Sequence, residues 1–128
     1  MPRFVVQHHV FPDGDEHWDL MLEVGDVLWT WSLPAPPDEP RRLPLSARQL
    51  AHHRAAFLDY EGPLRGHRGR VDIRDQGTYQ WIVPGEATGS EVADVFEFCL
   101  DGERARGRYR LLRAPHDGTD LWQLRRLA

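Results

Sequence analysis

Two histidines and one aspartate near the start of the chain have the types and spacing of a metal-binding set. His17 and Asp19 lie two residues apart in a strand-like segment, and His9 ends the segment before it. Side chains two apart on a strand point to the same face. If Val10 pairs near Glu16 in an antiparallel hairpin, His9 lies opposite His17, with Cβ atoms about 5 Å apart. Two imidazoles and a carboxylate suit Zn²⁺, Mn²⁺ or Fe²⁺, and such an ion could orient a phosphate group and neutralise its developing charge.

The spacing of these three residues also allows two other interpretations. Polar residues of these types are ordinary on a solvated sheet face, where three nitrogen or oxygen donors often meet by chance. A mononuclear Fe²⁺ oxygenase also uses two histidines and one carboxylate. In that class a His-x-Asp pair usually comes first and the remaining histidine later, whereas here His9 precedes the pair. The oxygenase therefore ranks below a metal site directed at phosphate.

Alternating apolar residues predict that the three residues belong to a three-stranded meander. Residues 4–10, 17–24 and 27–33 alternate with a period of two, and turn residues separate them. One face of the first two segments is apolar and is expected to face the core, with Phe4, Val6, Val10, Trp18, Leu20 and Leu22. The opposite face carries the polar residues Gln7, His9, His17 and Asp19.

The remaining chain predicts more short strands and one helix. The strand-like segments are 71–76, 79–83, 95–100, 105–111 and 121–124. A capping-box pattern at 46–49, followed by apolar residues at helical spacing, predicts a helix over 47–58. Many short strands with one helix indicate a mainly β fold, a compact antiparallel β-barrel of about seven or eight strands. At this length we expect a single domain over residues 1–128.

The composition narrows the class of protein without naming a partner. The net charge of −4 speaks against a broad nucleic-acid surface, but all sixteen basic residues are arginines, whose planar guanidinium group suits phosphate. Cys99 is the only cysteine, so no internal disulfide can form. No apolar run has the length of a membrane span and no secretory leader is visible. We therefore expect a cytoplasmic protein without membrane contact, and the oligomeric state stays open.

Several longer runs resemble the 3′-phosphoesterase domain of bacterial DNA ligase D, a domain of the DNA polymerase ligase N-terminal type. The first runs read F-V-V-Q-H-H at 4–9, H-W-D-L-M-L-E at 17–23 and V-L-W-T-W-S-L-P at 27–34. They are similar to the family's F-V-(I/V)-Q-K-H, H-Y-D-F-R-L-E and V-L-K-S-W-A-V-P. Looser matches follow at 41–43 (K-R-L-A), 53–62 (H-P-L-D-Y-x-x-F-E-G) and 100–109 (L-x-G-x-R-L-x-G-x-W).

The resemblance implies a metal-dependent enzyme, favouring manganese, that trims 3′ ends in DNA repair. It would remove a terminal ribonucleoside and then the 3′-phosphate. By motif, His9, His17 and Asp19 are the metal ligands, with Mn²⁺ expected and Zn²⁺ or another divalent ion as alternatives. His53 becomes the candidate catalytic residue at the scissile phosphate, and Arg42 a candidate phosphate contact. The implied partners are DNA or RNA–DNA 3′ ends, with a separate ligase or polymerase as a candidate co-worker.

Three positions depart from the family pattern. Met21, Phe57 and Ala35 stand where the family has an arginine, a tyrosine and a lysine. Losing such a donor lowers the rate by on the order of 10²–10³. The alternative function is therefore a metal-binding relative with weakened catalysis that docks nucleic acid or a repair partner. Substitute phosphate contacts could come from His52, His67, Arg65, Arg68 and Arg70, although a charged surface turn explains these residues equally well.

A row of arginines in the last third of the chain also has two interpretations. Arg104, Arg106, Arg108 and Arg110 alternate along one predicted strand and could follow a nucleic-acid backbone. We favour pairing with nearby acids on a solvated face, because exposed ion pairs are common. The nearby acids are Glu97, Asp101 and Glu103.

Overall fold

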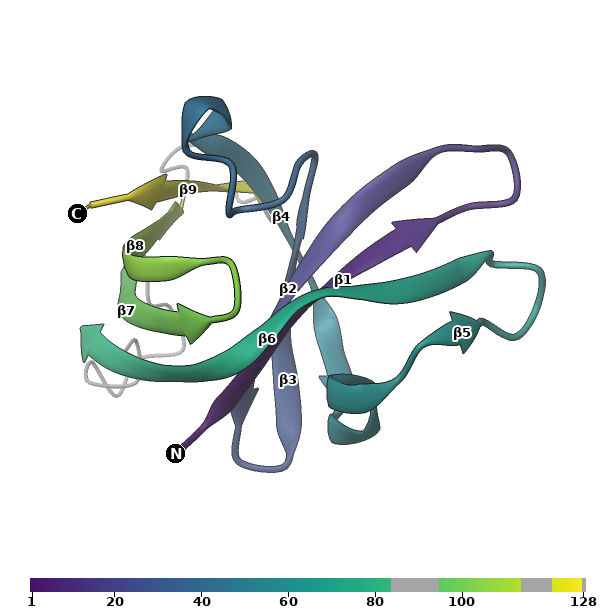
Figure 1. The fold of residues 1–128 in the computed structure, drawn as a ribbon, viewed down its shortest axis with the longest axis horizontal. Helices are drawn as coiled ribbons and strands as arrows, with labels where there is room; N and C mark the ends of the chain where they lie inside the picture. The colour runs from purple at the N-terminus through teal and green to yellow at the C-terminus, as the bar shows by residue number, and fades with distance from the viewer. Residues whose placement is uncertain (84–94, 114–120, 128) are drawn as a thin grey trace.

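In a computed structural model that describes residues 1–83, 95–113 and 121–127, the chain forms a closed antiparallel barrel (Figure 1). The strands are β1 (Arg3–Val10), β2 (Glu16–Val24), β3 (Val27–Leu33), β4 (Leu45–Arg54), β5 (Gly62–Pro63), β6 (Arg70–Val83), β7 (Val95–Gly102), β8 (Arg106–Arg113) and β9 (Leu121–Arg126). Two short 3₁₀ turns, η1 (Pro40–Arg42) and η2 (Ala55–Asp59), interrupt them. Among the described residues no helix is long and apolar enough to cross a membrane.

The barrel closes because β6 pairs with both β7 and β1. The strands run in the order β1-β2-β3-β4-β9-β8-β7-β6, and β5 adds to the start of β6. The ring of eight strands confirms the predicted fold class. In Figure 1 the end of β1 and the start of β2 extend to one side, together with β5 and the start of β6.

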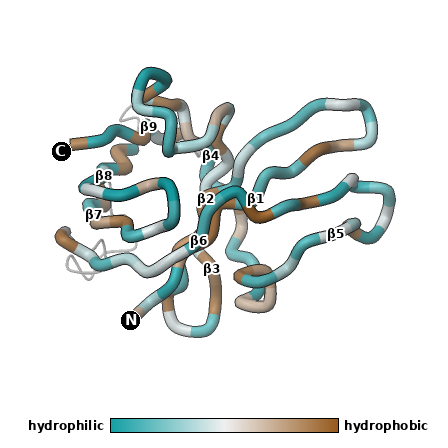
Figure 2. The backbone as a smooth tube through the Cα atoms, in the orientation of Figure 1, coloured by the Kyte–Doolittle hydropathy of each residue, from teal (hydrophilic) through white to brown (hydrophobic). Residues whose placement is uncertain are grey.

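The interior of the barrel is filled by the apolar residues of the alternating strands. Trp31, Tyr79, Phe98 and Tyr109 are nearly inaccessible to solvent and pack in one large cluster. Figure 2 shows the matching brown and teal alternation along the strands. Alternating tryptophans on a strand are usually core residues; Trp31 is buried in this cluster, and Trp29 packs against it from a partly buried position.

A second, smaller apolar cluster lies on the outer face of the sheet. Val5 of β1, Met21 of β2 and Leu28 of β3 are buried there beneath Leu58 of η2. Because β1 and β2 are covered on both faces at this point, η2 is held against the sheet by apolar burial. The cluster places η2 beside the polar residues that continue along the same face.

The prediction of a helix over 47–58 is wrong. Residues up to Arg54 continue β4, and only Ala55–Asp59 turn as a 3₁₀ helix. The register between β3 and β4 shifts between Leu28 and Thr30, so the strand period is broken and the apolar spacing imitates a helix. Ala47, where the helix was predicted to begin, lies on β4 and is buried inside the barrel.

The predicted break at Gly77 is also absent, and β6 runs through it without interruption. A Cβ at Gly77 would lie 2.1 Å from the carbonyl oxygen of Asp101 on β7. Glycine is therefore needed at this position because the backbones of β6 and β7 approach closely, which leaves no room for a side chain.

A buried carboxylate holds the turn between β7 and β8 and gives a test of the fold. Asp75 accepts backbone N–H bonds from Gln76, Glu103, Arg104 and Ala105 at 2.7–3.0 Å. Asp75→Ala would remove this shared acceptor, although the Glu103 N–H keeps the Gln76 carbonyl oxygen at 3.3 Å. We expect the free energy of unfolding to fall by about 3 kcal/mol. Urea unfolding of this variant beside Asp101→Ala, an exposed acid nearby, provides the measurement. Equal stability of the two variants would contradict this role.

Candidate metal centre

The outer face of the β1–β2 hairpin carries the predicted site as a ladder of cross-strand pairs. His9 pairs with His17, Gln7 with Asp19, and Val5 with Met21. The register is therefore the one expected from the sequence. The face changes along the hairpin from an apolar pair to a polar pair to a pair of imidazoles.

His9, His17 and Asp19 come together at the open end of this ladder. One donor atom from each lies within 4.8 Å of the others. The Nε2 atom of His17 is 3.2 Å from Oδ1 of Asp19, and the two imidazole rings meet edge to face with centroids 4.9 Å apart. Asp19 is only 3% exposed, while both histidines are partly exposed. A small group could therefore reach the cluster from the imidazole side.

The buried carboxylate of Asp19 has an unusual environment. Its Oδ1 atom is inaccessible to solvent and has no hydrogen-bond partner among the described residues. An ionised carboxylate is expensive to bury without partners. A divalent cation between the carboxylate and the two imidazole nitrogens would satisfy it, so the donor set fits such an ion.

The orientation of His9 is set from outside the hairpin. Its Nε2 atom lies 2.7 Å from the carbonyl oxygen of Arg68. Because a carbonyl only accepts, Nε2 must carry a proton, which leaves Nδ1 as the ring nitrogen that can bind a metal ion. The loop reaches His9 because Gly69 passes very close to β1, where a Cβ would lie 1.9 Å from the Val10 carbonyl oxygen. A backbone acceptor on the second ring nitrogen is typical of metal-bound histidine.

Gln7 anchors η2 beside the cluster, a role that the sequence analysis did not assign. Its side chain is 1% exposed and donates hydrogen bonds to the carbonyl oxygens of Phe57 at 2.9 Å and Tyr60 at 3.0 Å. The signal was present, because Gln7 stands two residues before His9 on the same strand face. The residue ties the end of η2 to the position opposite Asp19.

His53 shares the outer face with the cluster but stands apart from it. It pairs with Leu28 on β3, while Asp19 pairs with Ser32 of the same strand. At about 3.3 Å per residue, these levels differ by about 13 Å along the strands. His53 instead meets the Phe57 ring edge to face, with centroids 5.7 Å apart. Its predicted contact with phosphate stays a prediction.

Arg42 lies on the surface in η1, with its guanidinium group 3.8 Å from the Glu39 carboxylate. Among the described residues, no contact joins it to the histidine and aspartate cluster. The role of Arg42 as a phosphate contact is therefore also a prediction.

Met21 lies on the same face as Asp19, as expected, but it is 1% exposed. It belongs to the apolar cluster beneath Leu58, against which Phe57 also packs. The position that the family pattern gives to an arginine is therefore closed off from solvent by η2 in this chain.

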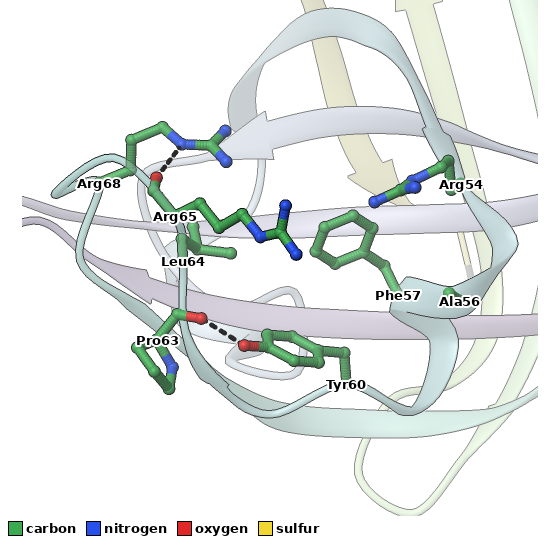
Figure 3. A pocket seen from close by; sticks show the side chains of 8 residues that line it. All are labelled: Arg54, Ala56, Phe57, Tyr60, Pro63, Leu64, Arg65 and Arg68. Carbon is green, nitrogen blue, oxygen red and sulfur yellow. Dashed lines mark hydrogen bonds between the residues drawn. The ribbon is translucent and has the colours of Figure 1, made fainter.

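Several hollows lie around the β1–β2 hairpin in the described part of the chain. One of about 640 Å³ is lined in part by Phe11, His67 and Arg70, and two others are smaller. The first of these two has a volume of about 290 Å³ and lies between η2 and the loop before β6, lined by Arg54, Ala56, Phe57, Tyr60, Pro63, Leu64, Arg65 and Arg68 (Figure 3). The second, of about 300 Å³, is shallower and contains His17 together with Asp15, Glu16, Ser32, Leu33, Pro34, Ser46, Arg48 and Leu121. Arg54 and Arg48 were not among the predicted site residues.

The predicted substitute phosphate contacts separate in the structure. Arg65 and Arg68 line the first hollow. Arg70 pairs instead with Asp72 at 2.9 Å and lowers the pKa of that carboxyl through their hydrogen bond. His52 stacks on Trp29, with ring centroids 5.8 Å apart.

Two of the four arginines in the row that leads into β8 pair with an acid, as we favoured. Glu97 of β7 lies 3.5 Å from the guanidinium group of Arg108 and 2.9 Å from that of Arg110. Arg106 donates to the carbonyl oxygen of Gly102. The ion pairs of Glu97 therefore account for two of the four arginines.

Comparisons with known proteins agree with the resemblance. A sequence model described as the DNA Ligase D 3′-phosphoesterase domain matches residues 7–113. The multifunctional non-homologous end joining protein LigD of Pseudomonas aeruginosa is 29% identical over 113 residues, which cover 87% of this chain and 13% of that protein. The non-homologous end joining DNA repair protein LigD of Mycobacterium tuberculosis is 29% identical over 129 residues, covering 97% and 16%. The chain thus spans less than a fifth of either relative.

The anchoring role of Gln7 gives a test of how the site is built. Gln7→Ala would remove the side-chain donor to the carbonyl oxygens of Phe57 and Tyr60, of which the Phe57 oxygen keeps the N–H of Tyr60 at 3.4 Å. We expect a loss of about 2 kcal/mol in the free energy of unfolding. Urea unfolding measures it, with the exposed Gln80→Ala as the matched control, expected to stay within about 0.5 kcal/mol of the wild type. An equally small effect of Gln7→Ala would show that η2 is held by apolar burial alone.

Proposed function

Because the chain belongs to the DNA ligase D 3′-phosphoesterase domain family, we propose that it is a divalent-metal-dependent phosphoesterase that acts on 3′ ends in DNA repair. The observation that carries the proposal is the cluster of His9, His17 and Asp19, whose donor atoms lie within 4.8 Å of one another and include a buried carboxylate oxygen that has no hydrogen bond among the described residues. Mn²⁺ is the ion we propose, with Zn²⁺ or another divalent ion as the alternative.

Each residue of the cluster contributes differently to holding an ion. Asp19 supplies the negative charge from a buried position, and His17 offers Nε2 beside it. His9 offers Nδ1, because its Nε2 proton is held by the Arg68 carbonyl. When bound, the ion would supply Lewis-acid stabilisation of the charge that develops on a phosphate oxygen.

The substrate we propose is a DNA or RNA–DNA strand that ends in a 3′-phosphate or a 3′-ribonucleoside. The two relatives carry non-homologous end joining in their names. Because this chain spans only 13–16% of them, ligation or synthesis would fall to other protein segments. We therefore propose that a ligase or polymerase uses the trimmed 3′-OH.

A second candidate function is a metal-binding module with weakened catalysis. Burial of Met21 beneath Leu58 favours it, since β2 then presents no cationic side chain next to Asp19. Restoring an arginine by Met21→Arg is a poor test in this chain, because it would place a guanidinium group inside an apolar cluster. Activity assays on the wild type distinguish the two candidates better.

Metal binding can be tested by thermal unfolding in chelator and in excess Mn²⁺. Asp19→Asn removes a buried charge that lacks a hydrogen bond, so in chelator it should unfold at the same temperature as the wild type or higher. Mn²⁺ at a hundred times its Kd should stabilise the wild type by about 2.7 kcal/mol and the variant hardly at all. Asp26→Asn, on an exposed turn, should keep the wild-type response. A variant that is strongly destabilised in chelator, with its Mn²⁺ response intact, would contradict the metal site.

Catalysis can be tested on a primer–template whose recessed primer ends in a 3′-phosphate. We expect the wild type with Mn²⁺ to convert it to a 3′-OH, and His17→Ala to reduce the rate at least about 100-fold, more than loss of an outer partner of a metal ligand does. The product is measured by the changed mobility of the labelled primer on a denaturing gel. His52→Ala, an exposed histidine stacked on Trp29, is the matched control. Metal uptake by a wild type that releases no phosphate would favour the binding module instead.

A further inference from the structure

The hollow between η2 and the loop before β6 combines unpaired positive charge with an apolar floor. Arg54, Arg65 and Arg68 line it, and no carboxylate does among the described residues. In a chain of net charge −4, three arginines without acids form a local excess of positive charge. Guanidinium groups that repel one another are stabilised by an anion placed between them.

The acids closest in sequence are already engaged elsewhere. Asp59 binds the Arg3 guanidinium group at 2.6 Å, and Glu61 accepts the backbone N–H of Ile73 at 2.8 Å. The Nε atom of Arg68 donates to the Arg65 carbonyl. Among the described residues, the guanidinium groups of Arg54 and Arg65 have no hydrogen-bond or ion-pair partner, so both can receive a ligand.

The apolar lining gives the hollow a second property. Phe57, Leu64 and Pro63 contribute to its walls, and Figure 3 shows the Arg65 and Arg54 side chains extending toward the Phe57 ring from opposite sides. The Tyr60 hydroxyl donates to the Pro63 carbonyl oxygen and links the two walls. The hollow has a volume of about 290 Å³, near the lower end of the range for small-molecule sites, about 300–1,000 Å³. An aromatic surface beside guanidinium groups suits a nucleobase and its phosphate.

Both walls of the hollow are hydrogen-bonded to the strand that carries the metal-ligand cluster. On one side Gln7 donates to the carbonyl oxygens of Phe57 and Tyr60. On the other, His9 donates to the carbonyl oxygen of Arg68. Gln7 and His9 are neighbours on one face of β1, so these hydrogen bonds tie both walls of the hollow to the strand that supplies the ligand His9.

We propose that this hollow receives the last nucleotide of the DNA 3′ end, with Arg65 and Arg54 contacting its phosphate oxygens and Phe57 supporting the nucleobase. The inference rests on the proposed function and names the part of the DNA strand that the hollow holds. The two guanidinium groups occupy the role that the family pattern gives to an arginine at position 21. The second hollow fits an anion less well, because Asp15 and Glu16 line it beside Arg48.

The test is fluorescence anisotropy with 5′-labelled primer–template DNA whose recessed primer ends in either a 3′-phosphate or a 3′-OH. EDTA is present throughout, so neither turnover nor a metal ion contributes. We expect the full chain to bind the phosphorylated end at least tenfold more tightly, since a charged hydrogen bond is worth that much or more. The double variant Arg54→Gln/Arg65→Gln should lose most of this preference.

Two matched variants and one further probe locate the strand end. Arg104→Gln removes a charge from the exposed β7–β8 turn and should keep the preference, as should Arg48→Gln in the second hollow. A primer that ends in an abasic 3′-phosphate should bind the wild type several-fold more weakly. Equal binding of this probe would contradict the support of a nucleobase by Phe57.

The inference is overturned when the wild type shows no preference for the 3′-phosphate, or when Arg48→Gln or Arg104→Gln removes the preference as fully as the double variant does. Failure of the proposed function has a different signature, because it appears as absence of Mn²⁺-dependent phosphate release. The binding preference is read without metal, so the two failures are distinguishable.

Discussion

The cross-strand pairing of His9 with His17 is the constraint on which the site depends. Strand side chains alternate with a period of two, so a slip of one residue would turn every outward group of β1 or β2 into the core. Burial of Leu20 and Leu22 inside the barrel opposes such a slip. Pairing of β6 along the other edge of β1 holds the hairpin from a second side. The barrel core thus sets the geometry of a cluster that lies outside it.

The same ladder also organises the surroundings of the cluster. Gln7 holds η2 through two backbone carbonyl oxygens, and His9 holds the loop before β6 through one. These three hydrogen bonds position the walls of the arginine-lined hollow. Burial of Asp19 by the neighbouring groups leaves its Oδ1 atom without a hydrogen bond among the described residues, with the His17 imidazole 3.2 Å away. We therefore expect the buried carboxylate to lower the free energy of unfolding of the metal-free protein, and a bound cation to offset this loss.

The hairpin, its register and the barrel class could be predicted because they follow from local alternation of apolar and polar residues. The helix predicted over 47–58 was wrong because a register shift between Leu28 and Thr30 disguises β4. The hollow could not be derived from spacing, since it requires a 3₁₀ turn and a glycine-containing loop to meet over β1. For the same reason the sequence does not single out Arg54, whereas Gln7 stands two residues before His9 on the same strand face and could have been assigned to the site. Arg65 and Arg68 were suspected as phosphate contacts, but only the structure separates them from Arg70 and His52.

The most direct measurement of the central claim is an anomalous difference map from crystals of the protein soaked in a manganese salt. The account predicts one strong peak within bonding distance of a nitrogen of His9, a nitrogen of His17 and a carboxylate oxygen of Asp19. A map without a peak at this cluster, or experimental coordinates in which the three side chains diverge, would contradict the account.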